Sequence, residues 1–172
     1  MHFKSLVLLS FLIIFSACKK DKENSTENKI EQIKSQEITE QDISRLKYVE
    51  YILDSKTNII VQDWPDYLQL EDVVANIKKG DLVYFNDNKK VIQLLIKELK
   101  QNIPNALNSK SILSRILVLE TKLFKLESLL NLTTTSKKEL LGAIKEFLIS
   151  FSNLNFQMNK KVEFDSRVIE KP

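Results

Sequence analysis

The sequence predicts an all-α fold: an antiparallel bundle of four to five helices that ends in a C-terminal helical hairpin. From about residue 40 onward, apolar residues recur at spacings of three and four, which is the period of one helix face. In the last third of the chain, two such seams of matching pattern are joined by a short polar loop. Matched seams with a short connection specify an antiparallel pair of helices.

The first helix is expected over residues 40–61, with Thr39 as its N-cap and apolar residues at helical spacing along one face. Trp64-Pro65 ends it. Asp63 is expected to cap the second helix, because the fixed φ of Pro65 suits a first helical turn. Lys78-Lys79-Gly80 predicts the end of that helix, where cations face the carbonyl end and glycine can adopt positive φ.

A short apolar segment at 81–86 is expected to form a turn against the core, with Asn86 or Asp87 capping a third helix over 87–102. The hairpin follows. Its first helix starts at a cap on Ser109 or Ser111 and runs to about residue 132, and its second follows Thr133–Ser136. The expected seams are Ile112, Ile116, Leu119, Leu123, Leu126 and Leu130, and then Leu140, Ile144, Phe147, Phe151, Leu154 and Met158.

The bundle domain is therefore expected over 41–160, followed by an extended tail over 161–172. The tail prediction rests on the alternation of Val162, Phe164 and Val168, which is typical of an extended segment lying over a core.

Residues 1–17 are predicted to be a signal peptide. A short basic start precedes an apolar run from Leu6 to Phe15, and small residues stand before a cleavage point. The run is shorter than the roughly 20 residues that a transmembrane helix needs. Phe15-Ser16-Ala17-Cys18 resembles the lipobox of bacterial lipoproteins, which implies that Cys18 is lipidated and anchors the chain to a membrane. An ordinary cleaved signal peptide with an incidental cysteine is the alternative.

Residues 18–40 are interpreted as the lipidated cysteine and a polar tether. The charged cluster Lys19–Glu23 resembles the surface-export signals of Bacteroidota lipoproteins. The absence of Asp at position 19 implies the outer membrane, and both its periplasmic face and the cell surface stay open. The chain resembles the small helical lipoproteins of that phylum in its signal peptide and its composition, and this resemblance implies no functional residues.

The amino-acid composition excludes several classes of catalytic and metal site. The chain has one histidine, His2, and one cysteine, Cys18, both at its start. A mature chain therefore lacks the residues for histidine- or cysteine-based catalysis and for ordinary zinc sites. No Gly-rich phosphate loop is present. The net charge of +3, without basic runs, does not indicate nucleic-acid binding. We expect no cofactor, no metal and no enzymatic activity, with a carboxylate-only hydrolase as a minor alternative.

The expected function is a membrane-anchored, non-enzymatic interaction or accessory module with a protein partner in the envelope. The alternative is a helical module with a cavity for a lipid, a peptide or another small molecule. Trp and Tyr are favoured at interfaces, so four aromatic residues are candidates for an interaction surface: Trp64, Tyr67, Tyr84 and Phe85. The competing interpretation places Trp64 and Tyr67 in the core, where they would pin a helix junction. The oligomeric state is left open.

Overall fold

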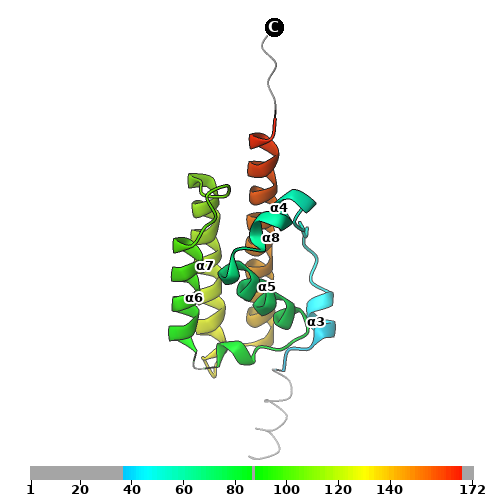
Figure 1. The fold of residues 1–172 in the computed structure, drawn as a ribbon. Helices are drawn as coiled ribbons and strands as arrows, with labels where there is room; N and C mark the ends of the chain where they lie inside the picture. Colours follow the sequence, from blue (N-terminus) through cyan, green and yellow to red (C-terminus); the bar gives the residue numbers. More distant parts are fainter. Residues whose placement is uncertain (1–36, 87, 168–172) are drawn as a thin grey trace, which may run out of the picture. The chain divides into compact units, whose positions relative to one another are not determined.

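A computed structural model describes residues 37–86 and 88–167, and all of the described secondary structure is helical (Figure 1). The predicted signal peptide, Cys18 and most of the tether lie outside the described residues. The helices are α3 (Glu40–Ser44), α4 (Ser55–Val61), α5 (Pro65–Lys78), the 3-10 helix η2 (Val83–Phe85), α6 (Lys89–Gln101), α7 (Lys110–Leu130) and α8 (Lys137–Asp165). The predicted all-α bundle is confirmed, although the described residues form six α-helices rather than four or five.

The α7–α8 hairpin is the largest contact between elements, as the matched seams predicted. All twelve seam residues are buried except Leu130, which is partly buried against the core. Ser109 caps α7, and Ser136 caps α8 in a capping box with Glu139. These caps satisfy main-chain N–H groups that have no partner within the helix.

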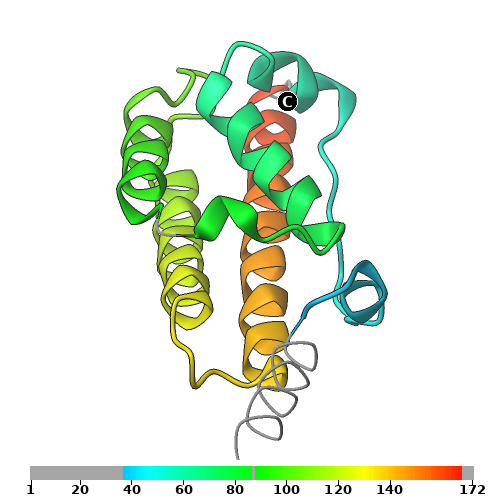
Figure 2. The same cartoon turned by 90° about the horizontal axis from the view of Figure 1, so that it is seen from below.

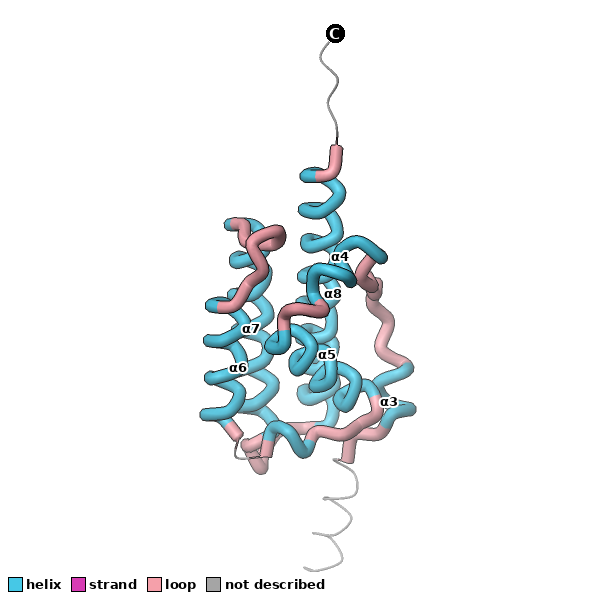
Figure 3. The backbone as a smooth tube through the Cα atoms, viewed as in Figure 1, coloured by secondary structure: helices cyan, strands magenta, loops and turns pink. Residues whose placement is uncertain are grey.

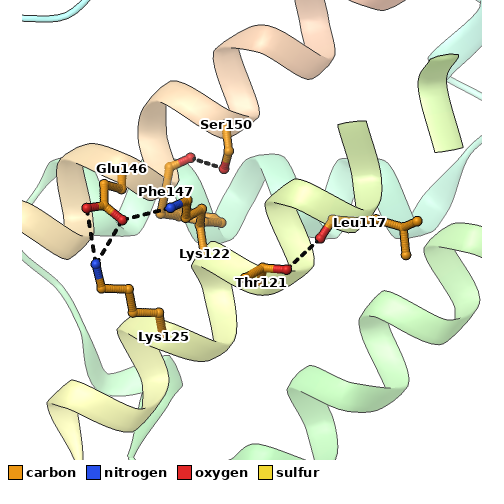
Figure 4. A network of polar contacts seen from close by, with 7 residues as sticks. All are labelled: Leu117, Thr121, Lys122, Lys125, Glu146, Phe147 and Ser150. Carbon is orange, nitrogen blue, oxygen red and sulfur yellow. Dashed lines mark hydrogen bonds and ion pairs between the residues drawn. The ribbon is translucent and has the colours of Figure 1, made fainter. Parts of the chain in front are cut away.

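Ion pairs on the flank of the hairpin join the two helices. Figure 4 shows Glu146 of α8 between Lys122 and Lys125 of α7, with N–O distances of 3.0 Å and 2.9 Å. These side chains are partly exposed, so the pairs add little to the energy of the buried seam. The same view shows two hydroxyls, of Ser150 and Thr121, each bonded to a carbonyl of its own helix.

The remaining helices cover the hairpin. The helices α3 and α4 pack on α8, α5 packs on α6, and α6 packs on α7 (Figures 1 and 2). A stack of aromatic rings fills the space between α5 and α8: the centroids of Trp64 and Tyr67 lie 5.6 Å apart, and those of Tyr67 and Phe151 lie 5.8 Å apart. Phe85 of η2 is also fully buried, which agrees with the predicted turn against the core.

The prediction of one helix over 40–61 is wrong. The chain forms α3, then a non-helical segment, then α4, and Figure 3 draws the segment between them as a loop. A new helix starts because Asp54 is an N-cap, with its side chain accepting a hydrogen bond from Thr57 N at 2.7 Å. We call the segment over 45–54 the strap. Main-chain groups of its residues Val49, Tyr51, Ile52 and Asp54 bond to side chains of α8.

The extended tail predicted from residue 161 is also wrong at its start, because α8 continues to Asp165. Val162 follows the buried Met158 by four residues and packs on the core. Charged pairs at helical spacing support this last part of the helix: Lys160–Glu163, Lys161–Asp165 and Glu163–Arg167. Residues 168–172 lie outside the described residues.

Two predicted caps shift by one or two positions. The N-cap of α5 is Trp64 rather than Asp63, with Pro65 in the first turn as expected. The N-cap of α6 is Asn88 rather than Asn86, and Asp87 lies outside the described residues. Gly80 follows the C-cap of α5 with a φ of 82°, as the stop signal predicted.

Candidate interaction site

The predicted surface of Trp64, Tyr67, Tyr84 and Phe85 does not form. Trp64, Tyr67 and Phe85 have 0% of their surface exposed. Only Tyr84 is partly exposed, and burial raises the pKa of its hydroxyl. The competing interpretation is therefore confirmed for Trp64 and Tyr67, which pin the start of α5 to α8 through stacked rings. Large flat side chains gain more by filling a bundle core than by lying on its surface.

The strap is the candidate site that the structure offers instead. It lies along α8, and its main-chain atoms bond to side chains of that helix. Three polar residues of α8, Ser152, Asn155 and Asn159, make these bonds, and we call them the α8 ladder. The bonds run from Tyr51 N to Ser152 Oγ (2.7 Å), from Ser152 Oγ to Val49 O (2.9 Å), from Asn155 Nδ2 to Tyr51 O (3.2 Å), from Asn159 Nδ2 to Ile52 O (2.8 Å) and from Asp54 N to Asn159 Oδ1 (3.0 Å).

The spacing of the ladder matches an extended chain. Seven residues of α-helix separate Ser152 from Asn159, a rise of about 10 Å. Their bonds centre on Glu50 and Leu53, and three residues of extended chain also span about 10 Å. The strap and α8 run in the same direction, so the strap stays in register with the ladder residues along its length.

Asn155 connects the ladder to the core. Its side chain is buried, and Tyr67 donates its hydroxyl hydrogen to Asn155 Oδ1 at 2.8 Å, which leaves Nδ2 to face Tyr51 O. The ring of Tyr67 is fixed in turn by its stacking against Trp64 and Phe151. Burial raises the pKa of Tyr67 far above its ordinary value, so its hydroxyl stays protonated and able to donate.

The side chains of the strap bury little. No residue from Ser44 to Lys56 is buried, and only Leu46, Tyr48 and Leu53 pack partly against the core. Each hydrogen bond of this kind contributes about 0.5–1.5 kcal/mol net, and exposure to water favours the lower end. The strap is thus held in place mainly by its ladder bonds and by its two ends.

Three apolar side chains of the strap are exposed. Val49 is 66% exposed, Ile52 is 76% exposed and Tyr51 is 38% exposed. Tyr51 packs against Phe156 of α8, which is 37% exposed, with ring centroids 4.6 Å apart. We call these four residues the strap surface. Clustered exposed apolar side chains mark interaction sites more often than single ones do.

The strap belongs to an arm, residues 38–54, that is fixed at its N-terminal end by α3. Ile38 and Ile43 are buried. Asp42 pairs with Lys137 at the start of α8 at 2.7 Å, and the hydrogen bond from Lys137 lowers the pKa of Asp42 far below its ordinary value. Glu50 of the strap pairs with Lys78 of α5.

Gly80 lets the arm lie close to the end of α5. A Cβ at Gly80 would lie 3.0 Å from main-chain atoms of Ile38, Thr39 and Glu40. That distance is tighter than most real Cβ contacts, so a side chain at position 80 would require the main chain of the arm to shift.

The sequence contained a signal for the ladder. Ser152, Asn155 and Asn159 recur at spacings of three and four and alternate with the seam residues Phe151, Leu154 and Met158. Three small polar residues that follow an apolar seam predict a second, polar contact beside it. The strap as their partner could not be read from this pattern, since it lies about a hundred residues earlier.

The described part of the chain contains no group of three or more acidic, His or Cys residues placed to hold a metal ion. Within residues 37–86 and 88–167, every helix is too short or too polar to cross a bilayer. Compared with known proteins, the chain matches no family model, and no curated protein or solved structure similar to it was found.

Proposed function

We propose that this chain is a lipid-anchored, non-enzymatic interaction module of the bacterial envelope that binds a protein partner through the strap surface. The observation that carries the proposal is the cluster of Val49, Tyr51, Ile52 and Phe156, whose apolar side chains face solvent. Trp64, Tyr67 and Phe85 are fully buried in the core, whereas Tyr51 and Phe156 stack on each other at the surface.

The described carboxyl groups with a shifted pKa belong to helix caps and ion pairs. Where the pKa of a described carboxyl group is shifted, it is lowered: this holds for Asp42, Glu139, Glu146 and Glu163. Helix caps and pairing lysines or arginines cause these shifts. A hydrolase that used carboxylates alone would need one acid with a raised pKa, held protonated near neutral pH.

The anchor part of the proposal rests on the sequence. Phe15-Ser16-Ala17-Cys18 follows a basic start and an apolar run, and Cys18 is the only thiol in the chain. Acyl chains on this cysteine would hold the protein at a membrane with about 0.8 kcal/mol per buried CH₂.

Protease treatment of intact cells tests the anchor. The full chain is compared with Cys18→Ser and with a variant in which Lys19–Glu23 is neutral. We expect Cys18→Ser to leave the membrane fraction. Digestion of the wild type from outside, lost in the neutral variant, would indicate surface display, whereas protection until the outer membrane is opened would indicate the periplasmic face. Membrane association that is unchanged in Cys18→Ser would contradict the anchor.

Photo-crosslinking in cells tests the interaction surface. A photoreactive residue replaces Ile52 in one strain and Leu94 in another. Leu94 is a matched control because it is exposed and apolar but lies on α6. We expect a discrete adduct from position 52 that is absent from position 94. Equal adduct patterns from both positions would contradict a partner site on the strap.

A further inference from the structure

The α8 ladder recognises the strap by its main chain. Every one of its bonds to the strap uses an N–H or C=O group, which all residues share, so the ladder itself does not distinguish one extended chain from another. Register and fit come from the partly buried side chains of Leu46, Tyr48 and Leu53. An arm of the same sequence offers both the main-chain groups that the ladder binds and the side chains that fit beside it.

The arm has few buried contacts to break, since only Ile38 and Ile43 among its residues are buried. The strap has no buried residue, so it should open at a lower free energy than the hairpin. The arm is the first part of the compact unit that begins at Ile38, so no earlier element of that unit has to be threaded. At its other end, Asp54 is already extended, with φ −75° and ψ 166°, so the chain can straighten there without strain.

The strap surface lies beside this hinge. When two copies exchange arms reciprocally, the connecting segments approach each other around a two-fold axis. Val49, Tyr51 and Ile52 lie on the strap just before the hinge, and Phe156 contacts Tyr51. In an exchanged pair, Tyr51 of each copy would therefore stack on Phe156 of the other copy.

We propose that the partner at this site is a second copy of the chain, and that two copies exchange arms 38–54 so that each arm docks on the other copy's α8 ladder. This inference rests on the proposed function only in that both place the partner at the strap surface. It does not depend on the lipid anchor. An extended segment of a different protein at the ladder is the competing outcome.

Disulfide trapping in solution tests the exchange. It uses residues 38–172, which form a compact unit with a core of their own and contain no native cysteine. Tyr51→Cys and Phe156→Cys are made in separate, differently tagged chains, which are mixed at high concentration and then oxidised. We expect mixed disulfides several-fold above those of a control pair, Leu94→Cys with Phe156→Cys.

A lock variant and the unsubstituted chain complete the test. With Tyr51→Cys and Phe156→Cys in one chain, oxidation at low concentration closes the arm on its own α8. We expect this variant to stay monomeric in sedimentation at concentrations where the unsubstituted unit dimerises. Mixed disulfides at the control level, or an unsubstituted unit that is monomeric at all concentrations, would overturn the exchange. An adduct from position 52 to a different protein would then leave the proposed interaction role standing.

Discussion

The α7–α8 hairpin and the arm over 38–54 lie against the same helix, but different interactions hold them there. The hairpin buries two apolar seams, and ion pairs on its flank join the two helices. The arm buries Ile38 and Ile43 near its start and is otherwise held by hydrogen bonds, two ion pairs and a close approach to Gly80. The comparison teaches that one helix can hold one neighbour by apolar packing and another by hydrogen bonds to its main chain.

Truncation of the hairpin core should give the largest effect. Phe147→Ala removes a fully buried ring from α8 and should lower the free energy of unfolding by about 3–5 kcal/mol. Denaturant titration measures the loss. Val118→Ala on the exposed side of α7 is the control and should change stability by less than about 0.5 kcal/mol. Similar losses for both variants would show that the hairpin is not the stability centre.

The hairpin was also the part that the sequence predicted best. Its seam residues are neighbours along one helix face, so their periodicity carries the information that packing uses. Ser109 was one of the two caps predicted for α7 for the same reason, because a cap acts on residues two or three positions away.

The strap could not be predicted because its partners are distant in the sequence. Leu46, Val49 and Leu53 suit a helix by spacing, but Ser152 captures the main chain of Tyr51 across 101 positions. The opposite error occurred at the C-terminus. The alternation of Val162 and Phe164 predicted an extended tail, but Val162 follows Met158 at helical spacing and belongs to α8. The four aromatic residues proposed as a surface were misplaced because aromatic residue types serve cores and interfaces alike.

Substitutions of two glycines test the contact between the arm and Gly80. Gly80→Ala places a Cβ against the main chain of 38–40 at a positive φ, so it should destabilise the protein by about 1–3 kcal/mol. Gly142→Ala lies in α8 with no atom within 4 Å of its Cβ, so it should stabilise by about 0.5–1 kcal/mol. Thermal unfolding measures both signs. A neutral Gly80→Ala would mean that the arm is not seated on α5.

Substitutions of two buried serines of α8 distinguish loss of the ladder bonds from a general effect on the helix. Ser152→Ala removes bonds to the strap, and because the freed strap groups can reach water the loss should be only about 0.5–1.5 kcal/mol. Hydrogen exchange at the Tyr51 amide should become faster. Ser150→Ala is the control, since its hydroxyl bonds Phe147 O within the same helix (Figure 4). Equal exchange at Tyr51 in both variants would argue against a ladder that holds the strap.

Acid should loosen the arm before the hairpin. Lys137 lowers the pKa of Asp42 below its ordinary value of about 3.9, so the pair stabilises the folded state above that pH. The contribution is lost as pH falls through the lowered pKa of the folded state. Glu146 of the hairpin, whose pKa Lys125 and Lys122 also lower, loses its pairs in the same direction. The hairpin keeps its two buried seams, whereas the arm keeps only the burial of Ile38 and Ile43, the ladder bonds and the Glu50–Lys78 pair.

An NMR titration of the Asp42 carboxyl group measures this smallest effect. The midpoint should lie below 3.9 in the wild type and rise toward that value of about 3.9 in Lys137→Gln. The rise should be incomplete, because Thr39 also donates hydrogen bonds to Asp42. The Ile43 amide should lose protection at a higher pH than the Ile144 amide. Loss of both at one pH would show that the arm and the hairpin unfold as a single cooperative unit, and arm exchange would then require global unfolding.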